Sequence, residues 1–229
     1  MLIIAHRGNE NGRNSLRENS STSLGRCLAR GWAVETDIRR SLQGKFYLSH
    51  DPALATEGNA IDVFFAMVRA CPMNISVALN IKELGYERDL VDLLVAERVI
   101  DRLFVFDMEL LEQTPGCSIR LFREIHRTIA IGARVSDRGE SIERALSFSE
   151  ARVIWLDEFD AGWVTEQTIR SLKDAGRTVF AVSPELHAAL SLTSVREHWG
   201  RLKQWGVDGI CTDYPEILQR FLTKTANED

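Results

Sequence analysis

Short apolar or β-branched runs alternate with amphipathic stretches along the chain, and the cycle recurs about every 25–30 residues. This spacing is typical of β-strand–α-helix units. Strands are expected over residues 2–7, 33–40, 75–82, 103–108, 119–125, 153–159, 178–183 and 209–212. Helices are expected over residues 20–30, 61–70, 88–100, 141–148, 165–175, 195–205 and 215–223. The pattern over residues 126–139 is ambiguous.

The number and order of these units predict an α/β fold, a single (β/α)8 TIM barrel. No linker rich in proline, glycine or serine divides the chain, so one domain is expected over residues 1–229. A Gln43-Gly44 turn and a second extended run over 45–50 predict a short hairpin after the second strand. The alternative, a doubly wound open sheet, needs a glycine-rich first turn of the GxGxxG type, which residues 4–12 (IAHRGNENG) do not supply.

Composition limits the classes of partner. The chain carries a formal net charge of −5, so it lacks the basic field that holds nucleic acid or an anionic membrane. The four cysteines form no CxxC pair and are expected to be buried thiols of a reducing compartment. No apolar run reaches the length of a signal-peptide core or a transmembrane helix. These features favour a cytoplasmic enzyme without membrane insertion, whose anionic substrate would be held by local cationic side chains or a metal ion.

Polar side chains occur at or near the carboxyl ends of the predicted strands, where the active sites of such barrels lie. They are His6, Arg7, Glu35, Asp37, Asn80, Lys82, Arg123, Glu124, Asp157, Glu158, Ser183, Glu185, Thr212 and Asp213. Because strand side chains alternate between faces, Glu35 and Asp37 share one face, and so do Asn80 and Lys82. Both pairs can therefore point towards a common centre.

The first fifty residues hold the densest set of such groups. His6 and His50 flank the Glu35 and Asp37 pair, and two facing imidazoles suit general acid–base chemistry near neutral pH. The alternative is that each is a hydrogen-bonded structural histidine. Structural or surface positions are expected for the other histidines, His126, His187 and His198.

Two carboxylates on one strand face need a cation close by. Glu35 and Asp37 are hard oxygen ligands that suit Mg²⁺ or Ca²⁺, and the alternative is an ion-pair network with neighbouring arginines. The cysteine and histidine spacing of a structural zinc site is absent from the sequence. Arg7 and Lys82 are the candidate phosphate-binding cations, since arginine contacts phosphate in a bidentate manner and lysine acts as a point charge.

Together these motifs resemble those of the glycerophosphodiester phosphodiesterases, which belong to the phosphatidylinositol-phospholipase-C-like phosphodiesterase superfamily of TIM barrels. The resemblance rests on the strings HRG, EN, ExD, a glycine turn and HD, in that order. The matching residues are His6-Arg7-Gly8, Glu18-Asn19, Glu35-Thr36-Asp37, Gly44 and His50-Asp51. Weaker matches are Asn80-Ile81-Lys82, Val207-Asp208-Gly209-Ile210 and Thr212-Asp213-Tyr214-Pro215.

The resemblance implies a hydrolase of lipid metabolism that acts on a small glycerophosphodiester-like or sugar-phosphate diester. In such enzymes the residues matching His6 and His50 act as general base and general acid. The residues matching Arg7 and Lys82 hold the phosphoryl oxygens. The attacking oxygen would be the substrate's own neighbouring hydroxyl, giving a cyclic phosphate that water then opens.

The resemblance also implies one divalent cation, Mg²⁺ or Ca²⁺, on the carboxylates matching Glu35 and Asp37. The family usually has ExK at the third strand, with the glutamate as third ligand, and this chain has Asn80 there. Asn80 is the expected third ligand through its amide oxygen. It adds no charge, so weaker metal binding is expected, because ligand charge tunes the affinity for hard cations.

A second departure is the short segment between His50 and the third strand, where relatives that take glycerol-based diesters carry a sizeable insertion. The wall that selects the alcohol is thus reduced or replaced. Two other functions stay open, a non-catalytic phosphate-ligand binding barrel with a weakened metal site and an unrelated barrel enzyme such as a sugar-phosphate isomerase. The isomerase is disfavoured because residues 181–187 lack the glycine of such phosphate sites.

Overall fold

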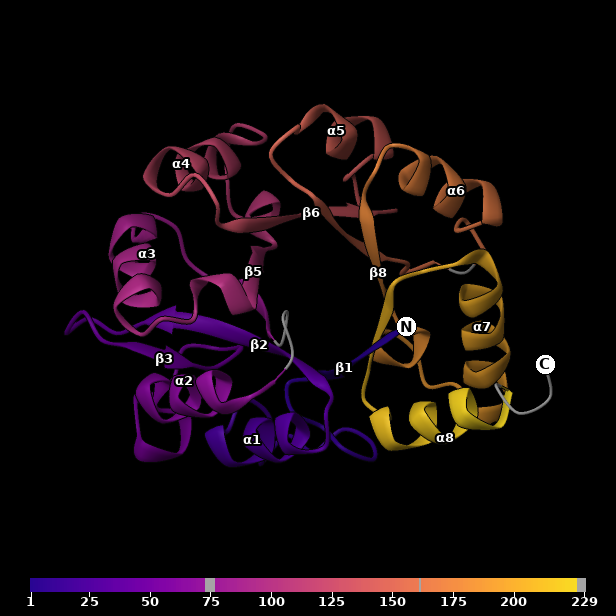
Figure 1. Cartoon of the computed structure of the whole chain (residues 1–229), viewed down its shortest axis with the longest axis horizontal. Helices are drawn as coiled ribbons and strands as arrows, with labels where there is room; N and C mark the ends of the chain where they lie inside the picture. The colour runs from indigo at the N-terminus through magenta and orange to yellow at the C-terminus, as the bar shows by residue number, and fades with distance from the viewer. Residues whose placement is uncertain (73–76, 161, 226–229) are drawn as a thin grey trace.

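The structure is a computed structural model that describes residues 1–72, 77–160 and 162–225. Within these residues eight parallel strands close into a barrel, because β1 pairs with β2 on one side and with β9 on the other. The barrel strands are β1 (Leu2–His6), β2 (Ala33–Arg40), β4 (Val77–Ile81), β5 (Leu103–Phe106), β6 (Ala130–Ser136), β7 (Val153–Asp157), β8 (Thr178–Val182) and β9 (Gly209–Thr212). The predicted (β/α)8 TIM barrel is confirmed (Figure 1).

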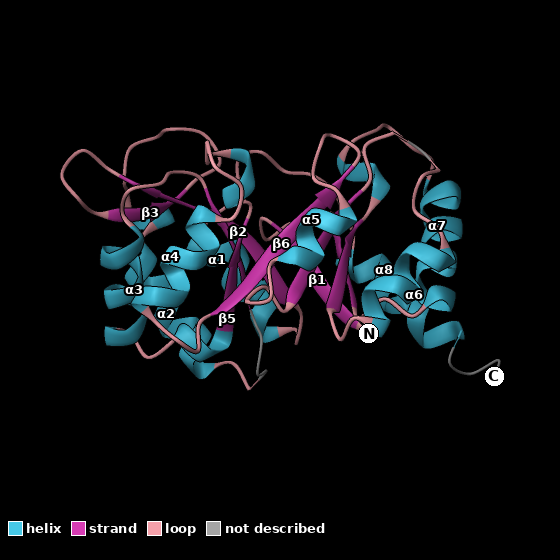
Figure 2. Ribbon diagram, turned by 90° about the horizontal axis from the view of Figure 1, so that it is seen from above, coloured by secondary structure: helices cyan, strands magenta, loops and turns pink. Residues whose placement is uncertain are grey.

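Helices surround the barrel (Figure 1), and Figure 2 shows them on both sides of the strands. They are α1 (Ser21–Ala29), α2 (Ile61–Ala70), α3 (Glu87–Ala96), α4 (Cys117–Ile125), α5 (Ile142–Ser147), α6 (Glu166–Asp174), α7 (Leu192–Trp205) and α8 (Pro215–Thr225). Four of them begin after a Ser or Thr whose hydroxyl accepts a backbone N–H, namely Ser20, Ser141, Thr165 and Ser191. None of the helices in the described part of the chain combines the length and apolar character needed to span a bilayer.

Shorter elements complete the fold. The strand β3 (Phe46–Leu48) pairs antiparallel with the end of β2 and forms the predicted hairpin outside the barrel. The start of the strand predicted over residues 75–82 lies outside the described residues. Short 3₁₀ helices are η1 (Glu57–Asn59), η2 (Ile100–Arg102), η3 (Met108–Leu110) and η4 (Pro184–Leu186).

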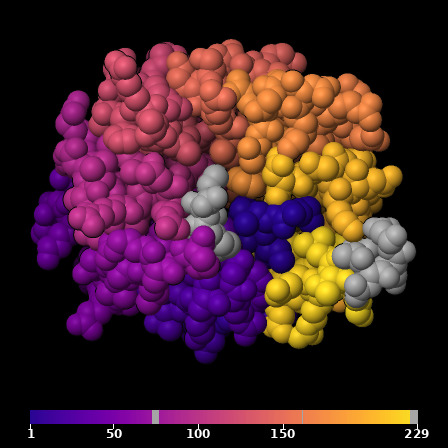
Figure 3. All heavy atoms as spheres, in the orientation of Figure 1, coloured from indigo at the N-terminus to yellow at the C-terminus, as the bar shows by residue number. Residues whose placement is uncertain are grey.

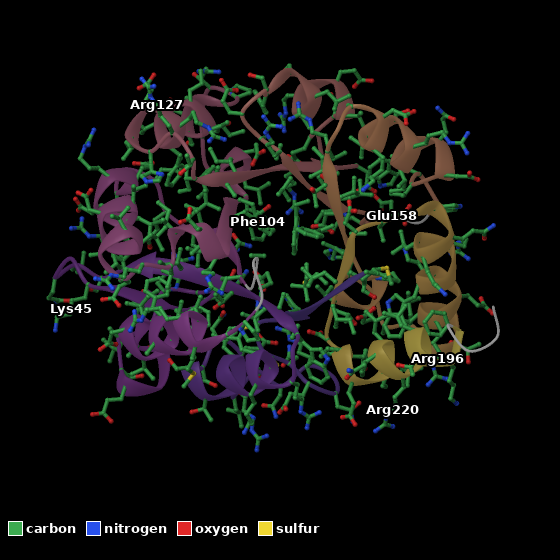
Figure 4. All side chains as sticks on the ribbon, viewed as in Figure 1. Lys45, Phe104, Arg127, Glu158, Arg196 and Arg220 are labelled. Atoms are coloured by element: carbon green, nitrogen blue, oxygen red, sulfur yellow. The ribbon has the colours of Figure 1, made fainter. Side chains whose placement is uncertain are left out.

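The strands separate two apolar layers. One layer lies between strands and helices and includes Val34, Leu79 and Trp199. The other fills the barrel and consists of Ile4, Ala33, Ala78, Phe104, Phe106, Val153, Trp155, Phe180, Val182 and Cys211. Figure 4 shows Phe104 directed towards the barrel centre, whereas Lys45 and Arg220 lie at the periphery.

The alternation of side chains turns this inner layer into a polar site at one end. On β1 the inward residues are Ile4 and then His6, and on β4 they are Ala78 and then Asn80. The carboxyl end of the barrel therefore carries polar groups above an aromatic floor. Figure 3 shows the opposite end, where the first residues of the chain lie between the segments of α2 and α8.

One predicted strand is wrong. Residues 119–125 form most of α4, and the fifth barrel strand is β6 in the stretch whose pattern is ambiguous. The buried Ile119 and Phe122 of α4 are three apart, which is a helical period. Gly132 hides the strand character of β6, yet the barrel requires it, because a Cβ there would lie 3.1 Å from the Phe104 ring.

The four cysteines form no disulfide within the described residues, as the sequence predicts. Cys27, Cys71 and Cys211 are buried, but Cys117 is exposed at the start of α4. The expectation of four buried thiols is therefore wrong at Cys117.

Candidate active site

A cavity of about 740 Å³ opens at the carboxyl ends of the barrel strands. Six of the seven site residues predicted from the sequence line it: His6, Arg7, Glu35, His50, Asn80 and Lys82. The seventh, Asp37, is fully buried beside them. The structure therefore brings together residues from β1, β2, β4 and the loop after β3.

His6 lies at the end of β1 between two carboxylates, and its ring is held by a hydrogen bond at Nδ1. Its Nδ1 atom is 2.8 Å from the Oδ1 atom of Asp213, and its Nε2 atom is 3.9 Å from the Oε2 atom of Glu35. Burial lowers the pKa of His6, but the hydrogen bond to Asp213 and the charge of Glu35 outweigh it, so the pKa is raised. Asp213 follows β9, which pairs with β1, so closure of the barrel creates this pair.

Asp37 is surrounded by donors. Its Oδ2 atom is 3.0 Å from Arg7 Nε and 2.9 Å from Asn19 Nδ2, and its Oδ1 atom is 3.2 Å from Lys82 Nζ. Burial raises the pKa of Asp37, but the charges of Lys82 and Arg7 outweigh it, so the pKa is lowered. The ion-pair network that the sequence leaves open thus forms around Asp37.

Glu35 lies two residues before Asp37 on the same inward face and is buried. Its Oε2 atom accepts a hydrogen bond from the backbone N–H of Arg7 at 3.2 Å. Burial, and then the nearby negative charge of Asp37, raise the pKa of the Glu35 carboxyl well above its usual range. A carboxylate pair of this kind favours an additional cation.

The HRG and EN motifs have clear structural roles. Arg7 and Asn19 have φ of +50° and +58°, and Gly8 has φ of +77° with no room for a Cβ, which would lie 3.0 Å from the backbone N of Leu24. Glu18 holds the Arg7 guanidinium, with Oε2 and Nη1 3.2 Å apart. Asn19 Oδ1 accepts hydrogen bonds from the Thr36 hydroxyl and the Asp37 backbone, so the EN motif fixes β2 in register with the first loop.

Asn80 stands in register with Asp37 on the neighbouring strand. Its Nδ2 atom donates a hydrogen bond to Asp107 Oδ2 at 3.0 Å, while its Oδ1 atom is buried without a hydrogen-bond partner among the described residues. Since an unsatisfied buried acceptor is costly, this atom is available as a ligand. Among the described residues no three or more His, Cys, Asp or Glu form a metal-type cluster, and the residue beside Glu35 and Asp37 on β4 is this amide.

Buried oxygens from Glu35, Asp37 and Asn80 fit a hard divalent cation in chemistry. Glu35 carries a pKa raised by burial and by Asp37, and Asn80 offers an unpartnered oxygen. Asp37 Oδ1 also lacks a hydrogen-bond partner among the described residues, although it is ion-paired with Lys82. Oxygen ligands of this type are those preferred by Mg²⁺ and Ca²⁺.

His50 lies on the loop after β3, at the edge of the cavity. Its backbone carbonyl accepts hydrogen bonds from Arg39 Nε at 2.9 Å and Arg39 Nη2 at 2.7 Å, which fixes the loop. The ring is 43% exposed, and Nδ1 lies 3.0 Å from Asp51 Oδ1. Partial burial, and then the charge of Arg7, lower the pKa of His50.

A second polar cluster in the cavity was not predicted. Arg134 of β6 replaces Arg123, which lies on the outer helix α4 and does not line the cavity. Arg134 Nη1 is 2.7 Å from Asp107 Oδ1, and Arg134 Nη2 contacts Asp157 Oδ2. His187, assigned from sequence to a structural or surface position, lines the cavity and contacts Asp157. Arg134 was missed because the fifth strand was predicted over residues 119–125 and not over β6. His187 was missed because no other candidate site residue was predicted to lie near it.

Neither a protein-family model nor a curated protein matches the sequence. Solved structures do match along nearly its whole length. A phosphodiesterase of Oleispira antarctica in complex with the product sn-glycerol-3-phosphate has a TM-score of 0.70 and 17% identity, covering 97% of this chain and 97% of that chain. A glycerophosphodiester phosphodiesterase of Parabacteroides distasonis has a TM-score of 0.70 and 17% identity, covering 98% of each chain.

A third match is a candidate glycerophosphodiester phosphodiesterase of Galdieria sulphuraria. Its TM-score is 0.75 at 18% identity, and 97% of each chain is covered. At these identities the likeness establishes a shared (β/α)8 fold along nearly the whole chain.

Proposed function

We propose that the chain is a metal-dependent phosphodiesterase that hydrolyses a small glycerophosphodiester-like or sugar-phosphate diester. One observation carries the proposal: a single cavity brings His6 and His50 together with the cations of Arg7 and Lys82. The order of motifs in the sequence and the shared fold with solved phosphodiesterases support it.

The two histidines are placed to move protons. An ionised Asp213 accepts only, so the Nδ1 atom of His6 carries the proton and Nε2 exchanges one with the substrate. One imidazole takes the proton of the attacking hydroxyl, and the other donates a proton to the oxygen of the leaving alcohol. In the second step water opens the cyclic phosphate, and the two proton transfers run in reverse.

The cationic side chains would hold the phosphoryl oxygens. Arg7 and Lys82 both contact Asp37, on Oδ2 and Oδ1, which fixes their positions without removing their charge from the cavity they line. Positive groups held in place before the reaction stabilise charge that develops on the phosphoryl group.

Glu35, Asp37 and Asn80 would hold one divalent cation, Mg²⁺ or Ca²⁺. When bound, the cation supplies a positive charge that stabilises the transition state of phosphoryl transfer. The Asn80 amide brings the ligand charge to −2, because only Glu35 and Asp37 are carboxylates. The proposed site is therefore one of modest affinity.

The solved relatives support the substrate class. The Oleispira antarctica phosphodiesterase is seen with sn-glycerol-3-phosphate, the product of its reaction. For this chain we infer a small phosphodiester with a hydroxyl next to the phosphate, because the cyclic route requires that nucleophile.

A second candidate function is a non-catalytic phosphate-ligand binding barrel. Asn80 favours it, since an amide in place of a third carboxylate weakens metal binding. This candidate predicts thermal stabilisation by a phosphodiester without release of product. Turnover of any diester at ordinary enzymatic rates would exclude it.

The two functions are separated by histidine variants. His6→Ala and His50→Ala are each expected to reduce turnover by at least about 100-fold while the melting temperature stays close to that of wild type. His126→Ala serves as the matched control, since His126 follows α4 and does not line the cavity, and it is expected to keep full activity. Full activity in both site variants would contradict the proposal.

A further inference from the structure

A second wall faces the proposed reaction centre across the barrel. In the closed ring of eight strands β6 lies four strands from β1, so Arg134 stands opposite His6. Both residues line the same cavity. We call the set Asp107, Arg134, Trp155, Asp157, Phe159 and His187 the distal wall.

Side-chain contacts join the polar residues of the distal wall to one another. Arg134 lies between two carboxylates, with Nη1 2.7 Å from Asp107 Oδ1 and Nη2 in contact with Asp157 Oδ2. The other oxygen of Asp107 accepts from Asn80, and the other oxygen of Asp157 contacts His187 Nε2. Each of the four carboxylate oxygens therefore has a partner within the protein.

These contacts fix the carboxylates of the distal wall. Arg134 pairs with Asp107 and Asp157 at once. The polar groups of the distal wall therefore form a hydrogen-bonded frame that holds His187 in place.

His187 supplies a hydrogen-bond acceptor of the distal wall that is open to a ligand. Its Nε2 atom is held by Asp157, and no hydrogen bond to its Nδ1 atom is found within the described ranges 1–72, 77–160 and 162–225. Because an ionised Asp157 is only an acceptor, Nε2 carries the hydrogen, and Nδ1 of the neutral ring is an acceptor. The side chain is 20% exposed and lines the cavity.

The ring of His187 is also held in orientation. Its centroid lies 4.1 Å from that of Phe159, and the Phe159 ring in turn packs against Arg134 and Arg138. Asp137 fixes the Phe159 loop by accepting its backbone N–H at 3.0 Å. The acceptor is therefore positioned before any ligand arrives.

Apolar side chains line the cavity that holds this acceptor. They are Phe106, Trp155, Phe159, Val182 and Leu186, of which Phe159 contacts the His187 ring. A polyol or sugar has both features that this surface matches, C–H faces for aromatic rings and hydroxyl hydrogens for an acceptor.

We propose that His187 determines specificity for the alcohol half of the substrate, by accepting a hydrogen bond from a hydroxyl of a neutral polyol or sugar. Asp157 is the positioning residue that fixes its tautomer. The inference rests on the proposed function, because it places the phosphate beside Arg7 and Lys82. The distal wall would then select the alcohol in place of the insertion that is missing after His50.

Binding, without turnover, tests the inference. Calorimetric titration in the presence of Mg²⁺ would compare glycerol 1-phosphate, methyl phosphate and phosphoethanolamine on wild-type protein, His187→Phe and His187→Gln. Wild type is expected to bind glycerol 1-phosphate about tenfold or more tightly than either other ligand. His187→Phe keeps an aromatic ring but lacks the acceptor. In this variant the ratio of the affinity for glycerol 1-phosphate to that for methyl phosphate is expected to fall towards one. His187→Gln keeps an acceptor and recovers part of the ratio.

Three results would overturn the inference. They are no preference for glycerol 1-phosphate in wild type, an unchanged preference in His187→Phe, and an equal loss of affinity for glycerol 1-phosphate and methyl phosphate in His187→Phe. Preference for phosphoethanolamine would overturn the choice of a neutral alcohol. A failure of the proposed function is distinguishable, because absence of diester turnover leaves these affinity ratios measurable. If His187→Phe does not fold, His187→Gln and Asp157→Asn carry the same comparison of ratios.

Discussion

The Nδ1 atom of His6 lies 2.8 Å from the Oδ1 atom of Asp213, although 207 positions separate the two residues in the chain. The pair exists because β9 closes the barrel against β1. Asn9 Nδ2 donates to the same oxygen at 2.8 Å, so Asp213 is held from two sides. The proposed proton-transfer group at one end of the chain is thus oriented by the other end.

Asp213→Asn is expected to reduce kcat by roughly 100-fold, because the amide no longer fixes the His6 tautomer or stabilises its charged form. The hydrogen bond to Asp213 raises the pKa of His6. Its loss lowers that pKa, so the limb of the pH–rate profile that reports His6 moves to lower pH. Asp174→Asn, an exposed change on α6, is the control. An unchanged profile in Asp213→Asn would contradict the assigned role.

Asn80→Asp is expected to tighten Mg²⁺ binding by roughly tenfold, because it raises the ligand charge from −2 to −3 at nearly constant shape. Calorimetric titration of Mg²⁺ measures the change, with the exposed Asn11→Asp as control for net charge. Without Mg²⁺ the variant is expected to be less stable than wild type, since the new carboxylate faces Asp107 at the place of a 3.0 Å hydrogen bond. Equal Mg²⁺ affinity in wild type and Asn80→Asp would remove Asn80 from the metal site.

Glu109 makes stability depend on pH. Its Oε1 atom accepts the Arg134 backbone N–H at 2.9 Å, its Oε2 atom is buried without a hydrogen-bond partner in the described part of the chain, and burial raises its pKa to about 7. The native state therefore binds more protons than the unfolded state between the ordinary pKa of 4.5 and about 7, so stability falls as pH rises through this window.

Glu109→Gln removes this titration. The variant is expected to match wild type below pH 4.5 and to be more stable by about 1–3 kcal/mol above pH 7. Urea denaturation at several pH values measures the difference. A difference that does not change with pH would show that Glu109 titrates normally in the folded protein.

Gly132→Ala tests the packing of the barrel interior. An added Cβ would lie 3.1 Å from both Phe104 Cδ2 and Phe106 Cβ, which is tighter than ordinary contact. We expect a loss of about 1–3 kcal/mol in the free energy of unfolding. Gly200→Ala is the matched control. Gly200 lies within α7, and a Cβ there would meet only the Phe221 ring, at 3.8 Å. A gain of about 0.5–1 kcal/mol in the free energy of unfolding is expected. Equal effects of the two changes would contradict this account of the interior.

Much of the fold follows from local pattern. The strand over residues 33–40 and the helix over residues 61–70 have the predicted bounds, since their apolar period and their flanking turns agree. The strand β6 was not predicted, because Gly132 and the inward Arg134 interrupt its apolar pattern. Gly132 leaves room for the Phe104 ring, and Arg134 lines the cavity. At both positions tertiary packing, and not strand propensity, explains the residue.

The site was predictable where its residues are adjacent in sequence. HRG, EN and ExD lie within the first forty residues, and the structure brings all of them to one end of the barrel. Asp213 was predicted as a polar residue at a strand end and as part of the weaker motif Thr212-Asp213-Tyr214-Pro215. Its pairing with His6 was not predicted, because 207 positions separate the two residues. His187 carried no local signal, since the contacts with Asp157 and Phe159 form only when the barrel closes.

The most direct test of the central claim is phosphodiester hydrolysis by the wild-type protein. A panel of glycerophosphodiesters would be assayed with excess Mg²⁺ or Ca²⁺ and again with a chelator. Turnover of at least one member is expected, and the chelator is expected to abolish it. No turnover of any diester by the folded protein would contradict it, and turnover that survives the chelator would contradict the part played by the metal.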